Sequence, residues 1–166
     1  MPDMKDAMRG AGLQGGRPQG GQGGPAQGRG ESRGGGENLF QKGYPQYFTP
    51  DGHLRVEVVT VEAEKMSERF ERDRLRRHQL RAFYDHAKRQ LQRLTYGAPF
   101  GDVLPEIGRL KVFAADRAGR TDNALPASFK QFIDRNVEAV VDEKAFRKGF
   151  MPHFEAVVGY CARIKD

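Results

Sequence analysis

Apolar side chains recur with the period of an α-helix along residues 69–94. At 100° per residue they fall on one face, spaced three or four residues apart: Leu80, Phe83, Tyr84, Ala87, Leu91 and Leu94. Such a ladder is typical of a helix that packs one side against a core. We therefore predict one long helix over residues 69–94 as the central element of a helical domain.

Basic side chains lie along one flank of this apolar face. They are Arg74, Arg77, Arg81 and Lys88, which project within an arc of roughly 60°, with Asp85 at its edge. Residues 69–93 hold nine Lys or Arg and three acids, a net charge of +6 that equals the formal net charge of the whole chain. Such a row suits a polyanion, because each neutralised phosphate releases counterions. A solvated helix face without a ligand is the alternative interpretation.

Helix-period apolar residues continue on both sides of this segment. A short extended stretch precedes a first helix from about residue 61, and three more helices follow the breaker cluster at residues 97–99, the last of them starting near Pro152. Because the loops are short and no convincing sheet is present, the pattern predicts an all-α fold, a compact bundle of about five helices.

The first 44 residues differ in composition from the rest. Residues 9–36 are mostly Gly, Gln, Arg, Pro and Ser, with Leu13 as the one apolar side chain larger than Ala. Such a segment buries too little apolar surface to offset its conformational entropy. We expect residues 1–44 to form a disordered Gly-rich tail and residues 45–166 to form a single helical RNA-binding domain.

The sequence offers no constellation of catalytic or metal-binding residues. The histidines show no HxxxH or HExxH spacing, and no Gly-rich phosphate loop follows a strand. The single cysteine, Cys161, excludes an intramolecular disulfide, and its place in an apolar stripe indicates a buried small hydrophobe. We expect no catalytic residue, no metal and no cofactor. The lack of a signal peptide or a long apolar run favours a cytoplasmic protein without membrane contact.

Three segments, taken in order, carry a resemblance to one family. They are HQLRAFY at residues 78–84, LKVFAADR at residues 110–117 and FEAVVGY at residues 154–160. In their order and spacing they resemble the small subunit of the type III-A CRISPR effector, the Csm complex. The resemblance covers most of residues 61–165.

This resemblance implies a compact five-helix protein without enzymatic activity, acting in antiviral defence. Several copies would self-associate in a filament along the crRNA-bearing backbone repeat subunits of the effector, in a complex that also holds the large subunit. They would contact the target RNA and its duplex with the crRNA through the sugar-phosphate backbone, without sequence preference. RNA cleavage would belong to the backbone subunit, and DNA cleavage and cyclic oligoadenylate synthesis to the large subunit.

The expected RNA-binding residues come from the motifs and from the charge pattern together. Gln79 and Arg81 match the first motif, and Lys111 and Arg117 match the second. The full expected set is Arg74, Arg77, Gln79, Arg81, Lys88, Arg109, Lys111 and Arg117. Glu155, in the third motif, is interpreted as structural, through a buried hydrogen bond or an ion pair to an arginine.

A different function stays open as the alternative. The chain would then be a helical protein-interaction module that docks an acidic protein partner through its basic face. The response to salt separates the two functions, because six neutralised phosphates give a slope of about −4 on single strands. An acidic protein partner predicts a shallow slope and no affinity for RNA.

Overall fold

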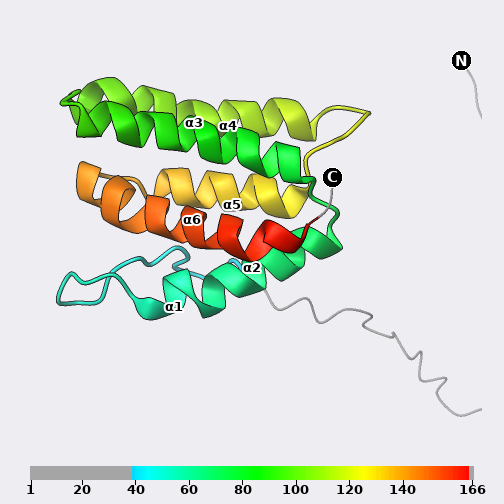
Figure 1. Cartoon of the computed structure of the whole chain (residues 1–166), viewed down its shortest axis with the longest axis horizontal. Coiled ribbons are helices and arrows are strands. Elements are labelled where there is room, and N and C mark those ends of the chain that lie inside the picture. The colour runs from blue at the N-terminus through cyan, green and yellow to red at the C-terminus, as the bar shows by residue number, and fades with distance from the viewer. Residues whose placement is uncertain (1–38, 165–166) are drawn as a thin grey trace, which may run out of the picture. The chain divides into compact units, whose positions relative to one another are not determined.

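The computed structural model describes residues 39–164, and no strand forms among them (Figure 1). The helical elements are α1 (Val56–Val59), α2 (Val61–Arg72), α3 (Arg77–Thr95), α4 (Phe100–Ala118), α5 (Ala127–Glu138), η1 (Ala145–Phe150), α6 (Met151–Tyr160) and η2 (Cys161–Arg163). The elements α2 to α6 are the long ones, which confirms the predicted all-α bundle of about five helices. Within the described residues, no helix has the length and apolar character needed to cross a membrane.

The helices stack in three levels around a core of phenylalanines. Figure 1 shows α3 beside α4 on one side, α5 and α6 in the middle, and α2 on the opposite side. The ring of Phe70 in α2 meets the ring of Phe129 in α5 at 5.2 Å, and Phe132 meets Phe154 of α6 at 5.3 Å. These edge-to-face pairs between fully buried rings join α2, α5 and α6 into one core.

The segment predicted as one long helix is two helices. α2 ends at Arg72 and α3 begins at Arg77, with Arg74 between them in the left-handed region at φ 59°. The N–H of Leu75 donates to the carbonyl of Phe70 at 2.9 Å, and Leu75 is 1% exposed. This is the hydrogen-bond pattern of a Schellman motif, with its apolar contact after the turn. The prediction of a continuous helix was wrong because burial of Leu75 outweighs helix continuation.

The residues before α1 belong to the packed domain. Phe40 is 8% exposed, and the hydroxyl of Tyr44 bonds to Nε2 of His153 in α6 at 2.7 Å. The expected boundary of the tail at residue 44 is therefore too late, because residues 39–44 already contribute to the core. The expected tail over residues 1–38 lies outside the described residues.

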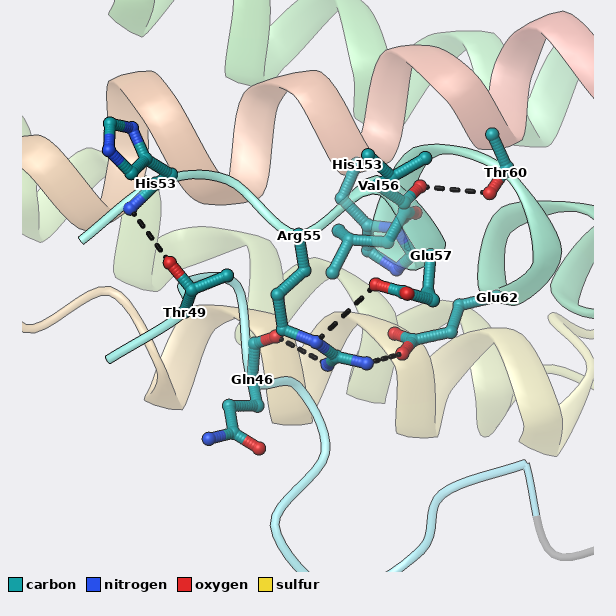
Figure 2. Close-up of polar contacts among 10 residues, drawn as sticks. Gln46, Thr49, His53, Arg55, Val56, Glu57, Thr60, Glu62 and His153 are labelled. Atoms are coloured by element: carbon teal, nitrogen blue, oxygen red, sulfur yellow. Dashed lines mark hydrogen bonds and ion pairs between the residues drawn. The ribbon is translucent and has the colours of Figure 1, made fainter. Parts of the chain in front are cut away.

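One arginine ties this N-terminal segment to the first helices, as Figure 2 shows. Arg55 donates from Nη1 to the carbonyl of Gln46 at 2.8 Å and from Nη2 to Oε1 of Glu62 at 3.0 Å. Its Nε lies 3.7 Å from Oε2 of Glu57. The guanidinium thus fixes the path of the chain between the segment before α1 and the start of α2.

The last long helix starts earlier than predicted. The chain is helical from residue 143, passes through the π-helix η1 and continues into α6 without a break. Oδ1 of Asp142 accepts the N–H of Ala145 at 2.6 Å, which satisfies a free donor at this end. Pro152 therefore lies just after the junction of η1 and α6, and not at the start of a helix.

Candidate nucleic-acid interface

Three of the basic residues of α3 form an exposed row, here called the α3 stripe: Arg77, Arg81 and Lys88. They project within about 40° of one another along the helix. Within the described part of the chain, neither Arg77 nor Arg81 makes an ion pair. No carboxylate in this part of the chain therefore neutralises their charge.

The stripe begins at the positive end of the α3 dipole. Arg76 is the N-cap, Arg77 is the first helical residue, and the first turn of α3 carries no acid. Acidic side chains commonly stabilise such a helix end, because free N–H groups concentrate positive charge there. An anion bound near Arg77 would therefore meet both the guanidinium and the helix dipole.

On one flank the stripe borders α6. Nζ of Lys88 lies 5.6 Å from the centroid of the Tyr84 ring, and that ring packs edge-on against Phe154 at 5.5 Å. Burial raises the pKa of Tyr84, and the neighbouring carboxylate of Glu155 raises it further. Of the two expected roles of Glu155, the hydrogen bond is present, because its carboxylate bonds to the Tyr84 side chain, but the residue is exposed and not buried.

Gln79 serves the fold of its own helix. It is 5% exposed, its side-chain oxygen accepts the N–H of Arg76 at 3.2 Å, and its amide donates to the carbonyl of Asn123 at 2.8 Å. Both polar ends of the side chain are therefore used inside the protein. Gln79 holds the start of α3 against the loop that follows α4.

The basic residues of α4 are engaged with neighbouring side chains. Nη1 of Arg109 lies 3.2 Å from Oε1 of Glu106, and its guanidinium lies 5.6 Å from the Phe113 ring. The guanidinium of Arg117 lies 5.3 Å from the ring of Phe83, and the residue is half-buried. These arginines hold positions on the side of α4 that meets α3.

Lys111 is turned toward a different helix. Its Nζ bonds to Oε1 of Glu138 in α5 at 2.7 Å. This hydrogen bond raises the pKa of Lys111 and lowers the pKa of Glu138, because it favours the charged form of both groups. Lys111 therefore lies on the α5 side of α4, away from the flank of α4 that meets α3.

The structure does not bring the expected residues into one patch. The α3 stripe borders α6, Arg109 and Arg117 lie where α4 meets α3, and Lys111 faces α5. Arg74 is exposed, three residues before the stripe, but it sits in the turn between α2 and α3 and not on a helix. The three residues of the α3 stripe are exposed and make no ion pair among the described residues, although Lys88 lies over the Tyr84 ring.

Sequence reasoning missed one further group of cations. Lys144, Arg147 and Lys148 are spaced by three and four residues, so they share one face of the helical run that contains η1. The acids and apolar residues around them concealed the group, which lies before the predicted start of the last helix near Pro152. Their helical spacing is the signal that identifies them.

The remaining candidate chemistry is buried or missing in the described residues. Cys161 is 2% exposed, which confirms its interpretation as a core residue, and burial raises the pKa of its thiol to about 12. Among residues 39–164, no group of three His, Cys, Asp or Glu side chains is placed to hold a metal ion.

A family model described as Csm2 Type III-A matches residues 54–165, a range that contains every described helix. No curated protein and no solved structure gives a significant match to the chain. The matched range includes all three motifs of the resemblance and the whole α3 stripe. The chain therefore belongs to the Csm2 Type III-A family, the small subunit of the type III-A Csm complex.

Proposed function

We propose that this chain binds RNA as a non-catalytic small subunit of the Csm complex, holding the target RNA and the crRNA by their backbone. The observation that carries the proposal is the exposed α3 stripe, whose cations make no ion pair within residues 39–164 and which begins at a helix end without acids. Arginine and lysine contacts to phosphate position a strand without reading its bases, so no sequence preference is expected. In this proposal the subunit acts in antiviral defence in the cytoplasm and needs no cofactor.

Within this proposal, Arg77, Arg81 and Lys88 are the principal phosphate contacts. Arg74 lies close enough in sequence to extend the row from the turn before α3. Arg109, Arg117 and Lys111 are secondary contacts, because Arg109 and Lys111 pair with carboxylates and Arg117 is half-buried over the Phe83 ring. Gln79 supports the stripe by fixing the start of α3.

The proposal also includes contacts with neighbouring copies, and the outer face of α4 is suited to them. At 100° per residue, an arc of about 100° carries no charge. It holds Gly101, Leu104, Pro105, Gly108, Val112 and Ala115. Val112 is 65% exposed and Leu104 39% exposed, in a chain of which 30% of residues are charged. We call this surface the α4 face.

The size of the α4 face favours a weak contact between copies bound to one RNA. A 19-residue helix is about 28 Å long and about 10 Å wide, which gives roughly 280 Å². Stable interfaces bury about 800 Å² on each partner. Copies held side by side on a strand gain effective concentration, so a small apolar contact suffices there.

Binding of the full chain to a single-stranded RNA of about 40 nucleotides, measured across a salt series, tests the RNA-binding proposal. Replacing Arg77, Arg81 and Lys88 together by Ala should weaken binding and reduce the magnitude of the salt slope by about 2, since each phosphate contact contributes about 0.7. The matched control replaces three ion-paired cations, Arg120, Lys130 and Arg163, by Ala.

The comparison of the two triple variants decides the outcome. Both triple variants lose three positive charges. If binding falls equally in the two variants, net charge alone explains the loss, and the proposal is contradicted. Loss confined to the α3 variant, with unchanged helical content, supports it. A wild-type chain that binds an acidic protein with a shallow salt slope and does not bind RNA would establish the protein-interaction alternative.

A further inference from the structure

A second basic site lies at one end of the bundle, apart from the α3 stripe. A hollow of about 560 Å³ opens between the turn at residues 48–54 and the η1 helix. Figure 1 shows both segments at the end of the bundle where α3 passes into α4. The hollow, here called the η1 hollow, is lined by Phe48, Gly52, His53, Leu54, Lys144, Arg147, Lys148 and Pro152.

Positive charge dominates this lining. Lys144, Arg147 and Lys148 line the hollow together, and no acid does. Glu143 lies beside it, with Oε1 2.9 Å from Nε of Arg147. Lys148 is exposed and has no partner among the described residues. Three cations on one helical face repel one another, so a bound anion would relieve a local excess of charge.

Two of the three cations are held in place before any ligand arrives. Nζ of Lys144 lies 4.8 Å from the centroid of the Phe48 ring. If Gly52 had a Cβ, that atom would lie 3.2 Å from Nζ of Lys144, so the turn at Gly52 lies close to the ammonium group. Nε of Arg147 is buried and makes no hydrogen bond, in spite of its short distance to Glu143. The site thus contains an unsatisfied donor.

The hollow also has an apolar part of its lining. It is formed by Phe48, Leu54 and Pro152, and Phe48 and Leu54 pack against the core. A volume of this size is within the range of sites that hold a small organic ligand, and it exceeds what a single carboxylate side chain fills. A cationic rim beside an apolar wall matches the two halves of a nucleotide, its phosphate and its base.

We propose that the η1 hollow binds one unpaired nucleotide of an RNA strand, with the phosphate on Arg147 and Lys148 and the base against Phe48, Leu54 and Pro152. The identity of the ligand as RNA rests on the proposed function. The site itself is separate from the α3 stripe and shares no residue with it. An RNA strand thereby gains a second point of attachment at the end of the bundle.

Photo-crosslinking of the full chain to a single-stranded 4-thiouridine RNA of about 8 nucleotides tests this proposal, with the modified peptides identified by mass spectrometry. Crosslinks are expected in residues 48–54 or next to Pro152. Lys148→Gln should lower their yield at least about fivefold, and Lys148→Arg, which retains the charge, should keep it within about twofold.

The outcomes separate this proposal from the function proposed above. Crosslinks confined to α3 and insensitive to Lys148→Gln overturn the η1 hollow and leave the α3 stripe standing. Crosslinks in the hollow that survive in the α3 triple variant support it. Competition of these crosslinks by an equimolar mononucleotide would show that a free nucleotide is the ligand, which overturns the assignment to RNA. Failure of the chain to bind any RNA removes both proposals.

Discussion

At position 74 an arginine occupies a backbone conformation that favours glycine. Its φ of 59° follows from the turn that buries Leu75 against the end of α2. A side chain in the left-handed region costs about 1 kcal/mol, which a glycine avoids. The backbone therefore carries strain at this arginine.

We expect Arg74→Gly to raise the free energy of unfolding by up to about 1 kcal/mol, since it removes the strain at the turn. Urea denaturation followed by circular dichroism measures the change. Arg72→Gly is the matched control, because Arg72 is helical and glycine there costs about 0.5–1 kcal/mol. Equal effects of the two substitutions would show that the turn carries no strain.

A buried histidine connects the N-terminal segment to α6. Val58 supplies a carbonyl, which only accepts, so Nδ1 of His153 carries the proton and donates to it at 2.6 Å. Nε2 then accepts the hydroxyl of Tyr44 at 2.7 Å. Tyr44 accepts from Asn136, whose Oδ1 accepts the hydroxyl of Tyr47. The network satisfies a neutral imidazole, whereas a second proton on Nε2 would deprive the Tyr44 hydroxyl of the acceptor for its own proton.

Stability should therefore fall as the solution is acidified. Burial lowers the pKa of His153 to about 4 from an ordinary value of 6.5. The unfolded chain binds this proton first, so the stability present above pH 6.5 is lost progressively down to about pH 4. The loss is about 3 kcal/mol by the constant that links pKa and free energy.

Urea unfolding at pH 7 and at pH 5 measures this dependence. His153→Gln should reduce the difference in unfolding free energy between the two pH values, even though it also destabilises the fold. His53→Gln, at an exposed position, should leave the difference unchanged. An undiminished difference in the His153 variant would mean that other groups carry the pH dependence.

At the level of elements, the N-terminal segment fits against η1 through a glycine. A Cβ on Gly149 would stand 2.5 Å from Cδ2 and 2.7 Å from Cγ of Tyr47, whose ring is 4% exposed and cannot move away freely. Close packing of this segment on η1 therefore requires the absence of a side chain at residue 149. The segment before α1 is part of the fold for this reason as well.

Gly149→Ala should lower the free energy of unfolding by about 1–3 kcal/mol, the usual cost of overpacking a core. Gly159→Ala is the matched control on the following helix, where no atom lies within 4 Å of the new Cβ. It should be neutral or stabilising by up to about 1 kcal/mol, since alanine is the better helix former. Thermal unfolding of both variants distinguishes a steric clash from a general effect of alanine.

The sequence predicted the helices well where their apolar period was regular, as in α4 and α5. Prediction from the sequence failed where a single long-range contact determines the path of the backbone. A helix end of this kind usually carries glycine, but here the residue is Arg74, so no glycine in the sequence marked the end of α2 or the burial of Leu75. The α3 stripe followed from its charge pattern, but the pairing of Lys111 with Glu138 depends on how α4 meets α5. The η1 hollow could not be predicted from its cations alone, because the turn at residues 48–54 forms part of its lining.

For the whole molecule, three surfaces with different chemistry lie on one small bundle. The α3 stripe and the η1 hollow are basic, whereas the α4 face carries no charge. A Cβ added to Gly101 or to Gly108 on that face would meet no atom within 4 Å, so packing inside the bundle does not require these glycines. Glycine inside a helix costs up to about 1 kcal/mol, a cost that a close approach by a neighbouring helix would explain.

The α4 face should therefore govern how several copies share one RNA. We expect Val112→Asp to leave binding to an RNA too short for two copies unchanged, because the α3 stripe is intact. On an RNA of about 40 nucleotides it should abolish cooperative loading, since a charge in a small apolar contact is left without a partner. Val141→Asp, at another valine that is 79% exposed, is the control and should load like the wild type.

Native mass spectrometry counts the copies on each RNA. Undiminished cooperativity in the Val112 variant would mean that copies meet through a different surface, and equal losses in both variants would point to net charge as the cause.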